Sequence, residues 1–79
     1  MNLTYDPRFN VAYIRFREKS DAVETLKISE ELLLDLAADG TLYGIELLNA
    51  NEQLKGENGA TLSVINEATG KKEEIGLDV

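Results

Sequence analysis

The feature that most constrains the fold is a mirror-symmetric apolar stretch, LLLDLAADGTLYGIELL, which spans residues 32–48. A two-residue hairpin turn needs positive φ at both central positions, and Asp39-Gly40 supplies it well. Folding the stretch about this pair sets three pairs of side chains opposite one another: Leu36 with Tyr43, Leu34 with Ile45, and Leu32 with Leu47. A slip of one residue would turn all six to the other face. The stretch therefore predicts two antiparallel strands with these side chains facing inward.

A second hairpin is predicted at the start of the chain. Residues 11–17, VAYIRFR, alternate between an apolar face and a face that carries Tyr13, Arg15 and Arg17, which is typical of a half-buried strand. The short strand NLTY precedes it, and DPRFN forms the loop, in which Pro7 fixes its own φ. Pairing Tyr5 with Ala12 and Leu3 with Ile14 keeps the apolar face continuous.

Residues 23–29, VETLKIS, predict a further strand with Leu26 and Ile28 facing inward. Val23 falls outside this alternation, which indicates a bulge or an irregular start.

The remainder of the chain has a weaker pattern. NANEQLKG suggests one or two helical turns, with Asn49 or Asn51 as N-cap and Gly56 as the stop. TLSVINEATGKKEEIGL can fold about residues 69–70 into a hairpin that sets Leu62 opposite Leu77 and Val64 opposite Ile75, although residues 60–68 also permit a short helix.

These elements predict one α+β, mainly β domain over residues 1–79. An antiparallel hairpin or meander sheet of about five strands occupies residues 1–50. A short helix or turn and a C-terminal hairpin occupy the tail, residues 51–79.

Composition restricts the chemistry available to this domain. The chain has no Cys, no His and no Trp, so a disulfide framework and the usual general base near neutral pH are both missing. A net charge of -7 argues against binding a phosphate backbone and suits a basic protein partner. No segment predicts a signal peptide or a membrane helix, and a cytoplasmic location is expected. No cofactor or metal site is predicted.

Five side chains on the polar face are the candidate partner-binding surface: Tyr13, Arg15, Arg17, Asp35 and Glu46. Tyr and Arg are favoured at interfaces. Asp35 and Glu46 occupy diagonal positions on neighbouring strands, so together with Tyr13 they could also form an acid/base pair or a weak cation site. The simpler interpretation is a solvated lattice of alternating charges.

The same outward face also carries Leu33, Leu42 and, less clearly, Val11 and Val23. A water-facing side of an antiparallel sheet is normally polar. Either the C-terminal hairpin or a second copy of the chain should therefore cover these residues, and exposed edge strands would invite strand addition. Self-association or binding of a protein partner is expected.

Two segments resemble a known family. YDPRFNVAYIRF (residues 5–16) and LLLDLAADGTLYGIELLNA (residues 32–50) are similar to the YDP...AYIRL and LLDLDEDGRLVGIEILDAS segments of a prokaryotic family of domains of unknown function, catalogued as 2283 and called YuzE-like. The chain departs from that pattern at Asn10, Ala37 and Ala38, where acidic residues are usual. The resemblance implies a small β-rich fold without an established activity. Family members are often encoded beside small toxin-like proteins, which suggests a neutralising role.

The main hypothesis is therefore a non-enzymatic, acidic protein-binding module, conceivably the neutralising partner of a toxin-like protein. The alternatives are a carboxylate-based, metal-dependent hydrolase and a purely structural homo-oligomer.

Overall fold

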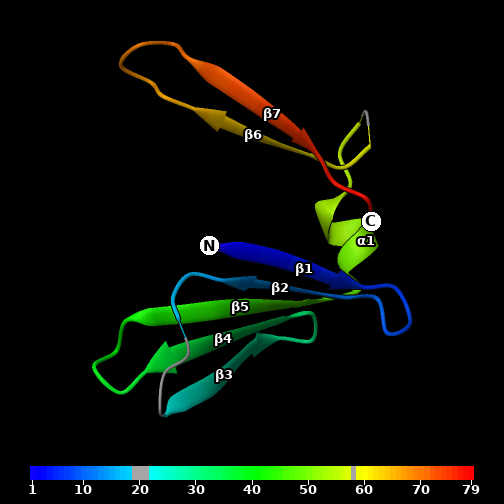
Figure 1. Ribbon diagram of the computed structural model, residues 1–79. Coiled ribbons are helices and arrows are strands. Elements are labelled where there is room, and N and C mark those ends of the chain that lie inside the picture. The colour runs from blue at the N-terminus through cyan, green and yellow to red at the C-terminus, as the bar shows by residue number, and fades with distance from the viewer. Residues whose placement is uncertain (19–21, 58) are drawn as a thin grey trace.

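The computed structural model describes residues 1–18, 22–57 and 59–79. Its chief element is one antiparallel sheet of five strands: β1 (Asn2–Asp6), β2 (Val11–Arg15), β3 (Val23–Ser29), β4 (Leu32–Ala37) and β5 (Leu42–Leu48). The helix α1 (Ala50–Leu54) follows, and β6 (Thr61–Ile65) and β7 (Lys72–Gly76) form a separate hairpin (Figure 1). The predicted mainly β fold class is confirmed. No helix in the described part of the chain is long and apolar enough to cross a membrane.

The strands do not lie in chain order. The sheet order is β1-β2-β5-β4-β3, so β5 inserts between β2 and β4, and β1 and β3 are the edges. Ala12 pairs with Leu47 and Ile14 with Ile45 across the β2–β5 boundary. This pairing joins the apolar rows of the two hairpins into one surface, which we call the inward face. The opposite surface, which carries Tyr13 and Asp35, is the outward face.

The first hairpin follows the prediction. Tyr5 pairs with Ala12 and Leu3 with Ile14. In the loop, the Asp6 carboxylate accepts a hydrogen bond from the backbone N–H of Arg8 at 2.9 Å and forms an ion pair with its guanidinium at 3.0 Å. The second strand is shorter than predicted, because β2 ends at residue 15 rather than residue 17.

The β4–β5 connection differs from the predicted two-residue turn. Ala37 donates to the Thr41 carbonyl at 2.8 Å and accepts from the Gly40 N–H at 2.9 Å, so the loop contains three residues. Gly40 has a φ of 85°, a value that glycine adopts without steric cost. Such loops commonly end in a residue with positive φ.

This longer loop changes the pairing close to the turn. Leu36 pairs with Leu42 instead of Tyr43, and the register shifts before Asp35 pairs with Gly44. The extra residue in the bulge compensates for the extra loop residue, so the predicted pairing of Leu34 with Ile45 and of Leu32 with Leu47 is confirmed. The prediction was wrong for two side chains, because the bulge turns Tyr43 outward and the pairing with Leu36 places Leu42 inward.

Two other registers also differ from expectation. In β3 the irregularity lies between Lys27 and Ser29, not at Val23, so Ile28 has no cross-strand partner and remains 55% exposed. The C-terminal hairpin forms, but Leu62 pairs with Ile75, which shifts the predicted pairing by two residues. The reason is a longer loop, since Asn66 donates from its N–H to the carbonyl of residue 71 at 2.8 Å.

Helix α1 begins at a clamp built by Asn10. Asn49 is the N-cap residue, yet its own side chain caps nothing. Instead the Asn10 carbonyl accepts from Ala50 N–H at 3.0 Å, and its side-chain Oδ1 accepts from Asn51 N–H at 2.9 Å and from the Tyr5 hydroxyl at 3.0 Å. Asn10 has a φ of 55°, a conformation that Asn tolerates better than most residues. The clamp fixes the helix to the β1–β2 loop.

The packed core is small. Among the described residues only Ala12, Gly44 and Ala50 are buried, and no large side chain is. On the inward face, one apolar groove of about 190 Å³ lies where the sheet, α1 and the hairpin meet, and its lining side chains are Met1, Leu3, Ile14, Phe16, Leu54, Leu62 and Leu77. The hairpin therefore joins the inward side, which contradicts the first of the two alternatives expected to cover the outward apolar residues.

Candidate functional site

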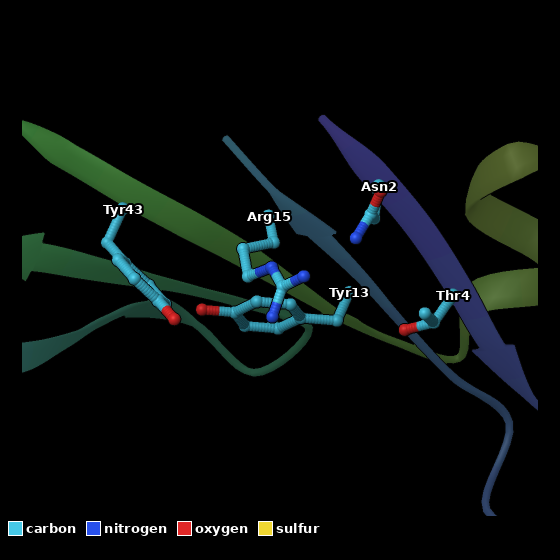
Figure 2. A pocket seen from close by; sticks show the side chains of 5 residues that line it. All are labelled: Asn2, Thr4, Tyr13, Arg15 and Tyr43. Atoms are coloured by element: carbon cyan, nitrogen blue, oxygen red, sulfur yellow. The ribbon is translucent and has the colours of Figure 1, made fainter. Parts of the chain in front are cut away.

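A shallow hollow of about 320 Å³ lies on the outward face, over strands β1, β2 and β5. Figure 2 shows the five side chains that line it: Asn2, Thr4, Tyr13, Arg15 and Tyr43. They come from two distant segments of the sequence, and the β2–β5 pairing brings these segments together. The hollow thus exists only in the folded sheet.

Tyr13 is held in place by a chain of hydrogen bonds across the sheet. Its hydroxyl donates to Asp35 Oδ2 on β4 at 2.7 Å, and the Thr25 hydroxyl on β3 donates to Asp35 Oδ1 at 2.6 Å. The tyrosine ring has to cross β5 to reach β4. It crosses at Gly44, where a Cβ would lie only 2.5–2.7 Å from ring carbons. Gly44 is therefore required by this close approach.

The electrostatics of this contact keep Tyr13 protonated. Partial burial, followed by the hydrogen bond to the Asp35 carboxylate, raises the pKa of Tyr13 well above its ordinary value. The negative charge of Glu46, which pairs with Tyr13 across β2 and β5, acts in the same direction. Tyr13 is therefore a hydrogen-bond donor and not a base or nucleophile near neutral pH.

Arg15 lines the hollow without a carboxylate partner among the residues that the structure describes. The ion pairs found in the described part of the chain involve Arg8, Lys27 and Lys72 instead. Arg15 lies opposite Asn2 on one side and Gly44 on the other. In the orientation of the Asn2 side-chain amide that satisfies its hydrogen bonds, the amide oxygen accepts a hydrogen bond from the Arg15 guanidinium at 2.7 Å. Within the described residues, this bond to Asn2 uses one of the five donors of the guanidinium.

The structure gathers some of the predicted surface residues and separates others. Tyr13 and Arg15 line the hollow, whereas Asp35 lies beneath the Tyr13 hydroxyl and Glu46 lies beside it on the same face. Arg17 is exposed beyond the end of β2 and does not line the hollow.

Sequence reasoning missed other residues of the site, among them Thr25, Tyr43 and Gly44. Gly44 carried the only usable signal, because a glycine inside a strand often marks the close approach of another group. Tyr43 could not be found, since its orientation depends on the bulge.

One carboxylate of the site, Asp35, has hydrogen-bond partners on both of its oxygens. The Tyr13 hydroxyl donates to one oxygen and the Thr25 hydroxyl to the other. Within residues 1–18, 22–57 and 59–79, no cluster of three or more acidic side chains could hold a metal ion.

Comparison with known proteins gives one result. No curated protein and no solved structure matches the chain significantly. The family described as Protein of unknown function (DUF2283) matches residues 2–51, which include all five strands of the sheet and the start of α1. The resemblance seen in the sequence is confirmed by this match, and the chain belongs to the DUF2283 family.

Proposed function

We propose that this protein is a non-enzymatic protein-binding module that uses the outward hollow as its anchor site. The observation that carries the proposal is the position of Arg15, which lines the hollow together with Tyr13 and Tyr43 and has no ion-pair partner in the described part of the chain. Arg and Tyr are the residues that most often dominate binding energy at protein interfaces. A carboxylate on the partner, either a side chain or a chain terminus, is the group that Arg15 would bind.

Preorganisation supports this role. Binding normally costs about 0.5–1.5 kcal/mol for each flexible side chain that becomes ordered. The hydrogen bond from Tyr13 to Asp35 orders the ring before any partner binds. The entropy of ordering this side chain is therefore lost during folding and does not reduce the binding free energy. The hollow can therefore present a fixed aromatic surface beside a charged group.

The net charge suggests the kind of partner. A charge of -7 attracts proteins with a basic surface over long distances and accelerates their association. A basic protein that also presents one carboxylate to Arg15 fits both features. Because relatives in this family were expected beside toxin-like proteins, a small basic protein of that kind in the cytoplasm is the first partner to test.

The test compares two arginines with the same charge. Tagged wild-type chain, Arg15→Gln and Arg8→Gln are expressed in the native cell, and co-purified proteins are quantified. Arg8 is the matched control, because its side chain is 80% exposed and contacts residues next to it in the chain, through an ion pair with Asp6 and a cation–π contact with the Phe9 ring. We expect one protein to be recovered with wild type and Arg8→Gln and lost with Arg15→Gln.

The recovered protein is then titrated with the purified full chain by calorimetry. Arg15→Gln should weaken binding by about 30-fold, the effect of a typical interface hot spot of about 2 kcal/mol, and Arg8→Gln by less than about twofold. Higher salt should weaken binding. Equal losses for the two variants, or no partner that depends on Arg15, would refute the proposal.

The hydrolase alternative uses Asp35, Glu46 and Tyr13. The hydrogen bonds that occupy Asp35 count against it. Titration with Mg²⁺, Mn²⁺ and Ca²⁺ separates the two functions, because a metal-dependent enzyme requires heat of binding or a thermal shift with at least one of these ions.

A further inference from the structure

In residues 1–18, 22–57 and 59–79, no segment covers most of the inward face of the sheet. The leucines of the central strands β4 and β5 remain partly accessible, and Leu26 on β3 and Phe16 beyond β2 are each 39% exposed. Helix α1 and the base of the hairpin cover only the part near Leu3 and Ile14. An apolar sheet face of this extent requires a covering layer in a stable protein.

The C-terminal hairpin has an uncovered apolar face of its own. Leu62 and Ile75 are paired on one side of it, and Val64 lies on the same side. The first two are 40% and 51% exposed. Figure 1 shows the hairpin standing apart from the sheet and joined to it through α1. Each chain therefore contains an open apolar sheet face and a separate apolar hairpin face.

The exposed area agrees with what a dimer would bury. The chain exposes 6018 Å² at a mass of 8.7 kDa, which exceeds by about 1,300 Å² the surface expected of a folded monomer of this mass. Its radius of gyration of 14.2 Å also exceeds the value of about 12 Å for a compact domain of this length. Permanent dimers bury about 1,000–2,500 Å² on each partner, so the excess lies within that range.

We propose that the occupant of the inward face is a second copy of this chain. In a two-fold pair, the apolar side of each β6–β7 hairpin lies on the inward face of the other copy's sheet. Because the two chains are related by two-fold symmetry, this one arrangement buries the inward face of the sheet and the apolar side of the hairpin in both chains. No other single partner is needed to explain why two separate surfaces of one chain are open.

The charge distribution allows two acidic chains to meet in this way. Asp35 and Glu46 lie on the outward face, away from the proposed contact. Glu24 shares the inward face with Leu36, but it lies on the edge strand β3, at the rim of the contact. On the hairpin, the ion pair between Lys72 and Glu74 lies on the side opposite Ile75. Glu73 shares the apolar side, but it pairs with Val64 near the hairpin loop and would lie at the rim of the contact.

Two isoleucines of the hairpin give a matched test. Ile75 and Ile65 are 51% and 55% exposed and lie on opposite sides of the hairpin. Ile75→Asp and Ile65→Asp therefore make the same chemical change, and both sites are accessible in the single chain. The mass in solution is measured by light scattering and sedimentation over a dilution series of each protein.

Wild type should have twice the mass of the single chain, and Ile75→Asp should raise the dimer dissociation constant by at least about 100-fold, since two charges enter the apolar contact. Ile65→Asp should change it by less than about threefold. Arg15→Gln, on the outward face, should remain dimeric, so this test is independent of the proposed binding function. A monomeric wild type, or equal effects of the two isoleucine substitutions, would overturn the proposal.

A second measurement needs no substitution and decides the matter if Ile75→Asp does not fold. Isotope-labelled and unlabelled wild-type chains are mixed, and NMR contacts between methyl groups of different copies are recorded. Contacts from Ile75 and Leu62 to Leu34 and Ile45 of the other copy are expected. If these methyl contacts occur only within one copy, the hairpin closes on its own sheet and the dimer is refuted.

Discussion

Replacing Gly44 with alanine should destabilise the protein, because the new Cβ would occupy the space of the Tyr13 ring. Cβ–ring distances of 2.5–2.7 Å are too short for any real contact, so the ring must move away. The movement breaks the 2.7 Å hydrogen bond from the Tyr13 hydroxyl to Asp35. Asp35 would keep only its bond from Thr25.

The expected magnitude follows from three contributions. The lost hydrogen bond to a charged group costs about 2 kcal/mol, and the lost packing of the ring on the strand costs about 1 kcal/mol. The alanine itself should stabilise the strand by about 0.7 kcal/mol, because glycine is unfavourable in a strand interior. Gly44→Ala should therefore cost about 2 kcal/mol, which lowers the melting temperature of a domain of this size by roughly 10 °C.

The assay is a double-mutant cycle measured by urea and thermal unfolding at one fixed protein concentration, since association would shift the apparent stability. In a Tyr13→Ala background the clash is absent, and Gly44→Ala should be neutral or stabilising by about 0.7 kcal/mol. The coupling between the two sites should be about 3 kcal/mol.

Gly76→Ala is the control for this cycle. Gly76 also lies in a strand, but nothing lies within 4 Å of the position of an added Cβ. It should be close to neutral. If Gly44→Ala has the same effect with and without the Tyr13 ring, the ring does not lie over β5, and the preorganisation argument for the hollow fails.

Two further predictions concern the clamp and the tyrosine. Asn10→Ala should cost about 2–3 kcal/mol in urea unfolding, because the N–H of Asn51 and the hydroxyl of Tyr5 lose their acceptor; a cost below about 0.5 kcal/mol would show that the clamp does not stabilise α1. Because the pKa of Tyr13 is raised in the folded protein, Tyr13 makes its full contribution to the free energy of unfolding below the pKa of an unfolded tyrosine, about 10. This contribution is lost as pH rises above that value, because the unfolded chain releases the tyrosine proton before the folded chain does. Tyr13→Phe should lack this alkaline loss, and parallel pH profiles of the two proteins would contradict the assignment.

Part of the candidate site could be predicted from local patterns. The alternation in VAYIRFR indicates that Tyr13 and Arg15 share a face, and this holds because a strand turns every second side chain to the same side. The position of Tyr43 was not predictable in this way. Its side depends on a three-residue loop and a compensating bulge, and Asp-Gly sequences are compatible with both loop lengths.

The sequence by itself determined the strands, the first hairpin and most of the pairing between β4 and β5, because burial of an apolar face allows only one register. Only the tertiary structure decided that β5 lies beside β2. Any two strands with alternating apolar side chains can pair, and the choice depends on contacts between residues more than 30 positions apart, such as Ala12 and Leu47. That pairing places Gly44 under Tyr13 and creates the hollow, since a side chain that crosses a strand needs a neighbour without a Cβ.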